Sequence, residues 1–297
     1  MGRPDFFCPP AKYRSCLYFT TFDAAMIVYP NAKINIGLNV EARRADGFHD
    51  IATLFYPVQG LCDVLEVIVA QGQSEPLRFT QSGLAIAGDV DSNLCVRAFG
   101  LMSQRLELPP LAVHLHKQIP MGAGLGGGSA DGAFMLMAIN ELMGNPLNDS
   151  ELSAMALALG SDCPFFLRNT PCVGRGRGER LSPTAINLHG MHLLLLLPDF
   201  GVSTAAAYGG VRPAPWTKPI EELLQLPISQ WGSALSNDFE PTVFAMHPQL
   251  AELKERLYAA GAVYAAMSGS GSTLYGIFAE SPNLSAFADV AHRLVGL

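Results

Sequence analysis

The clearest alternation of apolar and polar residues runs over residues 32–40. The apolar positions are Ile34, Ile36, Leu38 and Val40, and the polar positions between them are Lys33, Asn35 and Asn39. A period of two is typical of a half-buried β-strand whose polar side chains share one face. Residues 111–119 alternate in the same way, with His114, His116 and Gln118 on the polar face. The pattern therefore predicts two strands, each with one apolar face for a core.

Short apolar runs, turns and cap signals predict the remaining elements. We expect further strands at 63–69, 191–197, 263–267 and 273–278. We expect helices from a cap at 91–93 through Arg105, then at 129–143, from 149 or 150 to about 160, and at 221–226 and 248–260. Segment 121–128 holds five glycines and is expected to be a loop. This mixture indicates an α+β protein with two domains, 26–180 and 181–297.

Composition limits the class of protein. The chain has 297 residues, of which 49% are hydrophobic and 15% charged, and its net charge is −7. These values are typical of a globular enzyme and disfavour nucleic acid as a partner. The six cysteines form no C-x-x-C pair, which predicts reduced thiols and no structural zinc. Neither a membrane-length apolar run nor a secretory signal is evident, so we expect a cytoplasmic protein without a membrane partner.

Residues 1–25 differ from the rest of the chain. They are rich in aromatic residues, contain proline and lack periodicity, whereas Met26 opens a much cleaner pattern. We interpret them as an extension, either unstructured or produced by a mis-set start codon. An additional strand or a targeting peptide is the competing interpretation.

The strongest chemical signal is the segment from Pro120 to Ala130, Pro-Met-Gly-Ala-Gly-Leu-Gly-Gly-Gly-Ser-Ala, between a predicted strand and a predicted helix. Glycines allow the backbone to approach a ligand closely, and a helix N-terminus offers unpaired N–H groups to an anion. The segment therefore predicts a phosphate site, and Ser129 is placed to cap the helix or to lie near magnesium. A G-x-x-x-x-G-K-[ST] motif is absent. The fit to a Rossmann G-x-G-x-x-G is weak without its later acidic residue, and a plain loop is the remaining alternative.

Three further segments could carry chemistry. Asp162 follows a predicted helix and precedes an apolar turn, where a carboxylate could accept the proton of an attacking hydroxyl. Lys33 lies between apolar neighbours on its strand, where an ammonium group is partly desolvated. Segment 267–273 is a second Gly/Ser loop between strands. Taken alone, an aspartate such as Asp162 is more often a cap or turn residue, and a lysine such as Lys33 is more often a surface lysine.

The order of these segments resembles that of the GHMP kinase superfamily. Within it, the chain is similar to the 4-diphosphocytidyl-2-C-methyl-D-erythritol kinases over about residues 26–280. The motifs that carry this resemblance are Pro30-Asn-Ala-Lys-Ile-Asn35, Arg44-Ala-Asp-Gly-Phe-His49, Asp89-Val-Asp-Ser-Asn-Leu94 and Ser236-Asn-Asp-Phe-Glu-Pro241. The resemblance implies a ribosomal protein S5 domain 2-like N-terminal domain and a ferredoxin-like C-terminal domain. It also implies ATP-dependent phosphorylation of the 2-hydroxyl of 4-diphosphocytidyl-2-C-methyl-D-erythritol, in the non-mevalonate route to isoprenoids.

The resemblance also implies residue roles. It implies that Asp162 is the catalytic carboxylate and Lys33 its partner. ATP binding is implied for Asn93, Pro120, Gly122, Gly124, Leu125, Gly126, Gly127, Gly128 and Ser129. Substrate binding is implied for Asn35, Phe48, His49, Tyr208, Gly269 and Ser270, with the cytosine read by His49 and stacked on Phe48 and Tyr208. Magnesium is implied only as the companion of ATP, no all-protein metal site is expected, and the chain is expected to be a monomer or a weak homodimer.

Two other hypotheses stay open at this point. Another GHMP enzyme, such as a homoserine or mevalonate kinase, would share the glycine-rich loop but has little use for a cytosine-reading segment at 46–49. A catalytically silent sensor with the same fold would bind ligand without turnover. Retention of both Lys33 and Asp162 argues against the sensor, because a silent protein has no chemical need for that pair.

Overall fold

The computed structural model describes residues 25–86 and 88–297. Contacts divide them into two compact units. The first unit comprises the described residues up to Ala32, Gln59–Pro120 and Gly126–Asn169, and the second comprises Lys33–Val58, Met121–Leu125 and Thr170–Leu297. The predicted extension 1–25 lies outside the described residues except for Ala25. The predicted domains 26–180 and 181–297 stay a prediction.

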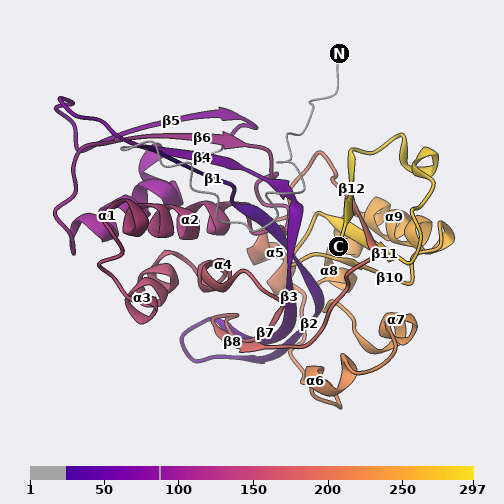
Figure 1. The fold of residues 1–297 in the computed structure, drawn as a ribbon. Helices are drawn as coiled ribbons and strands as arrows, with labels where there is room; N and C mark the ends of the chain where they lie inside the picture. Colours follow the sequence, from indigo (N-terminus) through magenta and orange to yellow (C-terminus); the bar gives the residue numbers. More distant parts are fainter. Residues whose placement is uncertain (1–24, 87) are drawn as a thin grey trace. The chain divides into compact units, whose positions relative to one another are not determined.

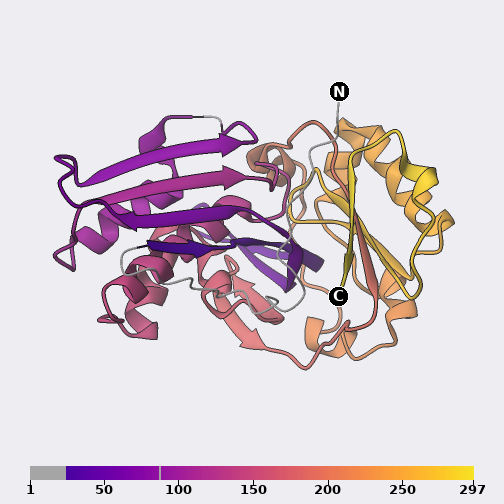
Figure 2. The ribbon, with the colours of Figure 1, turned by 45° about the horizontal axis from the view of Figure 1, so that its top comes forward.

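A four-stranded sheet forms one layer of the first unit. Its strands follow the order β1 (Ala25–Val28), β4 (Val64–Val69), β6 (Leu111–Lys117) and β5 (Leu77–Gly83). β4 is antiparallel to β1 and β6, whereas β5 runs parallel to β6. Figure 2 shows these strands side by side. The predicted alternation in β6 is confirmed, because Leu111, Val113 and Leu115 are buried while His114 is half-buried.

Helices form the other layer of this unit (Figure 1). α1 (Leu94–Ser103) and α2 (Gly127–Leu142) pack on each other and on the sheet, and α3 (Asp149–Leu159) and α4 (Cys163–Arg168) pack on them. A 3-10 turn at Val90–Ser92 precedes α1. The Asn148 side chain caps α3 and forms a capping box with Glu151. α2 begins at Gly127, two residues before its predicted start, so the expected loop 121–128 is wrong at its last two positions.

The second unit contains an antiparallel sheet with the strand order β10 (Tyr264–Met267), β11 (Leu274–Phe278), β9 (His192–Leu196) and β12 (His292–Gly296). α9 (Pro248–Ala259) packs on β10 and β11, and α8 (Glu240–Met246) packs on α9. α9 buries Leu250, Leu253 and Leu257, which share one face at helical spacing. These leucines join the apolar strand residues in one core.

The remaining sheet has the strand order β2 (Asn31–Arg43), β3 (His49–Cys62), β7 (Cys172–Gly176) and β8 (Arg180–Pro183). The strand predicted at 32–40 is confirmed within β2, but it is buried on both faces, whereas the prediction was a half-buried strand. Lys33, Asn35 and Asn39 are only 2–3% exposed. Their polar groups are satisfied by hydrogen bonds described below, which makes this burial tolerable.

Short helices complete the second unit. They are α5 (Thr204–Gly209), α6 (Ile220–Leu223) and α7 (Trp231–Ala234), with 3-10 turns at Ile228–Gln230 and Leu284–Phe287. The four cysteines of the described part, Cys62, Cys95, Cys163 and Cys172, are buried. Across residues 25–86 and 88–297, no helix is long and apolar enough to cross a membrane.

Candidate active site

The Lys33 and Asn35 side chains lie together on one face of β2. The Lys33 ammonium donates hydrogen bonds to Asn35 Oδ1 at 2.5 Å and to the Gly124 carbonyl oxygen at 3.1 Å. It also lies 5.5 Å from the centre of the Phe55 ring. A lysine that is 3% exposed and aimed by two acceptors is not a mobile surface lysine. Lys33 is therefore held in place, and its part in the reaction stays a prediction.

The loop Met121–Leu125 packs tightly against β2 and against the segment that follows β10. The Lys33 N–H donates to the Leu125 carbonyl at 2.9 Å, and the Ser268 hydroxyl donates to the Gly124 carbonyl at 2.8 Å. Gly124 has φ +77°, and a Cβ atom there would lie 1.8 Å from the Ser268 carbonyl oxygen. Only glycine fits this position, for both conformational and steric reasons.

Gly124→Ala is expected to destabilise the protein much more than Gly122→Ala. Gly122 also has a positive φ, +66°, but nothing lies within 4 Å of its missing Cβ atom. The control substitution should therefore cost only the left-handed strain of roughly 1–2 kcal/mol, whereas Gly124→Ala adds a clash with rigid backbone. Urea denaturation of the two variants measures the difference. Equal losses of unfolding free energy would show that the observed packing of Gly124 is wrong.

The second Gly/Ser loop, residues 268–272, is held by Asn237. The Asn237 amide donates to the carbonyl oxygens of Met267 at 2.7 Å and Gly269 at 2.8 Å. Glu240 accepts from the Met267 N–H at 2.8 Å. The Ser270 hydroxyl lies 3.1 Å from the Thr204 hydroxyl at the start of α5. The segment 236–241 thus supports the loop that carries the predicted binding residues Gly269 and Ser270.

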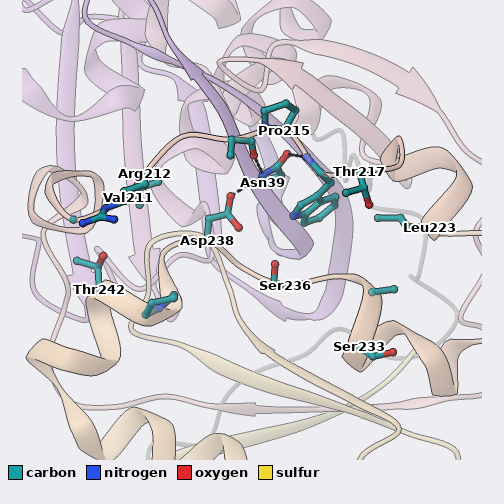
Figure 3. A pocket seen from close by; sticks show the side chains of 15 residues that line it. Asn39, Val211, Arg212, Pro215, Thr217, Leu223, Ser233, Ser236, Asp238 and Thr242 are labelled. Carbon is teal, nitrogen blue, oxygen red and sulfur yellow. Dashed lines mark hydrogen bonds between the residues drawn. The ribbon is translucent and has the colours of Figure 1, made fainter.

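Asp238 of the same segment lies in the wall of a pocket of about 680 Å³ (Figure 3). Its carboxylate accepts hydrogen bonds from the Asn39 amide and the Val40 N–H, both at 2.7 Å. Asn39 also donates to the Ala214 carbonyl and accepts from the Trp216 N–H. The Asn39 amide thus ties segment 214–216 to β2.

The predicted cytosine-reading residues come from two segments, with Phe48 directly before β3, His49 at its first position, and Tyr208 in α5. The His49 ring stacks on Tyr208 with ring centres 4.4 Å apart and 17° between the planes. Burial, with a smaller contribution from Arg43, lowers the pKa of His49, so its imidazole is neutral at pH 7. Phe48 is 49% exposed, and the Arg177 guanidinium lies 4.6 Å from the centre of its ring. The structure thus pairs the rings of His49 and Tyr208, while the Phe48 ring lies beside Arg177.

The first unit carries the other predicted residues. Gly126 is the N-cap of α2, and Gly127, Gly128 and Ser129 form its first turn, where backbone N–H groups lack intrahelical acceptors. The Ser129 hydroxyl hydrogen-bonds the thiol of Cys163, whose pKa burial raises to about 12. Asp162, next to Cys163, is the N-cap of α4. Ser129 and Asp162 are therefore close neighbours, because α4 packs on α2.

Asn93 and Pro120, also in the first unit, flank this region in sequence. Asn93 is half-buried, and its side-chain oxygen caps α1 by accepting from the Cys95 N–H at 2.9 Å. Pro120 follows β6 and is half-buried. Asn93 therefore has a structural role in any case, and a contact of either residue with a nucleotide stays a prediction.

Sequence reasoning missed a buried ionic cluster beneath α2. Lys117 at the end of β6 forms ion pairs with Asp63 and, at 2.7 Å, with Asp131 of α2. Asp63 also accepts from the N–H groups of Gln118 and Ile119 at 2.6 and 2.9 Å. The side chains of Lys117 and Asp63 have no exposed surface, and that of Asp131 is 4% exposed. The cluster therefore links the strand that leads into the glycine-rich loop with the helix that follows it.

The charges of this cluster do not balance. Burial lowers the pKa of Lys117, but the attraction of Asp131 and Asp63 outweighs it, and the pKa is raised overall. Burial and the repulsion of Asp63 raise the pKa of Asp131 well above its usual range, although Lys117 opposes this shift. Within the described residues, Asp131 Oδ1 has no hydrogen-bond partner. The ionised form of Asp131 is thus disfavoured by its burial in this cluster.

Asp131→Asn is expected to become progressively more stabilising, relative to the parent chain, as pH rises above about 4. A carboxyl group with a raised folded pKa stabilises the folded state below its unfolded pKa, and this contribution is lost as pH rises. Asparagine can still accept a hydrogen bond from Lys117 but carries no charge to bury. Denaturation of both proteins across the pH range measures the difference. Parallel stability curves would contradict the raised pKa of Asp131.

Comparison with known proteins identifies the class. Residues 93–169 match the GHMP kinases N terminal domain, and residues 220–294 match the GHMP kinases C terminal domain. The 4-diphosphocytidyl-2-C-methyl-D-erythritol kinase of Parabacteroides distasonis is 46% identical over 257 residues, covering 86% of this chain and 93% of that protein. The protein of the same name from Porphyromonas gingivalis is 44% identical over 261 residues, covering 87% and 94%.

Solved structures agree with these matches. The crystal structure of a 4-(cytidine 5'-diphospho)-2C-methyl-D-erythritol kinase has a TM-score of 0.76 and 33% identity, covering 91% of this chain and 98% of its own. The mevalonate kinase of Methanococcus jannaschii has a TM-score of 0.68 at 11% identity, covering 93% of this chain and 100% of its own, which shows a shared fold.

The chain therefore belongs to the GHMP kinases, which makes it a small-molecule kinase with ATP as its phosphoryl donor. Within that superfamily it belongs to the family of its 4-diphosphocytidyl-2-C-methyl-D-erythritol kinase relatives. The predicted resemblance and the α+β GHMP kinase fold are confirmed.

Proposed function

We propose that this chain transfers the terminal phosphoryl group of ATP to the 2-hydroxyl of 4-diphosphocytidyl-2-C-methyl-D-erythritol. The observation that carries this proposal is the stacked pair of His49 and Tyr208, with the exposed Phe48 next to His49 in the sequence. A neutral histidine both donates and accepts hydrogen bonds, which suits the edge of a cytosine. Aromatic rings beside it supply the faces on which a base stacks. Mevalonate and homoserine carry no base, so such a group has no use in their kinases.

We assign the nucleotide phosphates to the glycine-rich segment. Gly122, Gly124 and Leu125 lie in the loop of the second unit, while Gly126, Gly127, Gly128 and Ser129 open α2 in the first. The unpaired N–H groups and the positive end of a 16-residue helix suit an anion. Magnesium bound with ATP neutralises phosphate charge, and the Ser129 hydroxyl is the oxygen in this turn that fits it. We assign the adenine border to Asn93 and Pro120.

Phosphoryl transfer depends mainly on positioning and electrostatics. We assign to Asp162 the role of accepting the proton of the substrate 2-hydroxyl, or of orienting that hydroxyl. We assign to Lys33 the role of partner to Asp162, stabilising negative charge on the transferred group. Asn35 binds the substrate, and Gly269 and Ser270 close the site around it. The burial of Lys33 strengthens these interactions, because charges act more strongly where water is excluded.

Three general properties are part of the proposal. The enzyme acts in the cytoplasm, as a monomer or weak homodimer, on a pathway intermediate of isoprenoid synthesis. Residues 26–180 form the ATP-binding domain, and residues 181–297 form the C-terminal domain. Light scattering of the purified chain would test the oligomeric state.

The deciding experiment measures ADP release by the purified chain with Mg-ATP and one of three alcohols. We expect turnover with 4-diphosphocytidyl-2-C-methyl-D-erythritol and none with mevalonate or homoserine. Turnover with another alcohol would support the kinase activity but contradict the proposed substrate. ATP binding without turnover of any of the three would favour a silent sensor instead.

A further inference from the structure

The orientation of the Asn35 side-chain amide decides whether its oxygen or its NH₂ group faces the Lys33 ammonium. The Lys33 ammonium can only donate hydrogen bonds, so the atom of Asn35 that lies 2.5 Å away must be the amide oxygen. If the amide turned over, its NH₂ group would face the ammonium and two donors would oppose each other. A group that holds the amide in one orientation therefore also directs the lysine.

Thr53 of β3 is the group that holds it. Its hydroxyl lies 2.6 Å from the Gly37 carbonyl oxygen and 3.1 Å from Asn35 Nδ2. A hydroxyl has a single proton, and a carbonyl oxygen can only accept, so the Thr53 proton points to Gly37. The hydroxyl oxygen is then an acceptor toward Asn35 and requires its NH₂ end. Thr53 has no exposed surface, so water cannot replace it.

The backbone around Asn35 is fixed without the help of Thr53. The Asn35 carbonyl accepts from the Tyr275 hydroxyl at 2.7 Å, and the Asn35 N–H donates to Ser268 at 3.3 Å. The Gly37 N–H donates to the Tyr264 hydroxyl at 3.1 Å. Burial raises the pKa of both tyrosines, so their hydroxyls stay protonated. Loss of the Thr53 hydroxyl thus releases the amide while the strand keeps its place.

We propose that Thr53 is a positioning residue, whose hydroxyl sets the Asn35 amide and through it the direction of the Lys33 ammonium. The chain of hydrogen bonds runs from Lys33 to Asn35, from Asn35 to Thr53, and from Thr53 to Gly37. It rests on the proposed function, since it acts through the two residues assigned there to phosphoryl transfer. It does not depend on which alcohol is the acceptor.

Thr53→Val and Thr53→Ser test this role. Valine keeps the shape and removes the hydroxyl, whereas serine keeps the hydroxyl. We expect Thr53→Val to lower kcat by roughly 10–100-fold, the effect of small misplacements in an active site. The KM for ATP should not change, and Thr53→Ser should restore most of kcat. In an Asn35→Ala background, Thr53→Val should have almost no further effect, because the amide that it positions is gone.

A second readout works without turnover. In the ¹⁵N-resolved NMR spectrum of the full chain, the Asn35 side-chain NH₂ pair is identified by its absence in Asn35→Ala. We expect this pair to shift in Thr53→Val and to keep its position in Thr53→Ser. If the parent chain phosphorylates a different alcohol, or none, this spectrum still decides the role of Thr53.

Two results would overturn the proposal. One is an unshifted Asn35 NH₂ pair in Thr53→Val. The other is a loss of kcat that persists unchanged in the Asn35→Ala background, which would show that Thr53 supports the fold generally. A melting temperature measured for each variant identifies any protein that has failed to fold, and Thr53→Ala, which also lacks the hydroxyl, then replaces Thr53→Val in the comparison.

Discussion

Asp162→Asn is expected to lower kcat with the cytidylyl substrate by roughly 10²–10⁴-fold, the range for general acid–base groups. Asparagine has the size of aspartate and can occupy the N-cap of α4, but it cannot accept a proton. The KM for ATP should change little, since the nucleotide is assigned to other residues. Lys33→Met should cause a loss of similar size, because it removes the buried cation that donates to Asn35 and Gly124.

The double variant separates a joint role from two independent ones. Residues that act as a unit have non-additive effects, so Lys33→Met with Asp162→Asn should be little worse than either alone. Asp149→Asn is the matched control, because Asp149 is an exposed carboxylate at the start of the neighbouring helix α3. If Asp162→Asn keeps most of kcat and the Asp149→Asn control is unchanged, Asp162 does not take part in the reaction.

The parts of the site that depend on local pattern could be predicted from the sequence. Lys33 and Asn35 lie on one face of β2 because strand side chains alternate, and the apolar residues between them show that alternation directly. The glycine-rich segment indicated a backbone that turns sharply or approaches a ligand closely. The helix cap that includes Asn93 could be predicted because a capping side chain accepts from a backbone N–H only two residues away.

Other features depend on pairings that no local pattern reveals. β3 is buried on both faces over much of its length, so it lacks the alternation that would mark it as a strand and single out Thr53. The Asn237 amide reaches a carbonyl 30 residues away, and Lys117 reaches Asp63 across 54 residues. Such partners are chosen by the tertiary fold, and the sequence alone shows only their separate residue types.

The early start of α2 has a different cause. Glycine disfavours a helix interior, which placed the predicted start at Ser129. The propensity cost of glycine matters less in the first turn of a helix, where packing decides the conformation. A Cβ atom at Gly127 would lie 2.8 Å from the Ile119 side chain, so the packing there requires glycine. Glycine is therefore used here to bring the helix close to the end of the preceding strand, and close packing overrides propensity.

Lys117→Met is expected to lower the free energy of unfolding by about 3–5 kcal/mol, the cost of leaving buried charge without its partner. The substitution leaves the carboxylates of Asp63 and Asp131 without their cation. The Asp63 side chain has no exposed surface, and the Asp131 side chain is 4% exposed. Typical domains have only about 5–15 kcal/mol of stability in total, so the loss is large. Urea denaturation of the variant and the parent chain measures it directly.

The pH dependence shows whether charge or packing causes this loss. Without Lys117, the buried carboxylates repel each other with no cation beside them, and this cost to stability grows as pH rises past the ordinary carboxyl pKa near 4. The deficit of Lys117→Met should therefore grow from acidic to neutral pH and shrink when Asp63→Asn and Asp131→Asn are added. Arg105→Met is the control, because the exposed Arg105–Glu151 pair contributes at most about 1 kcal/mol. A deficit that is independent of pH would assign the loss to the packing of the lysine stem, and the cluster beneath α2 would then stabilise the fold through its shape.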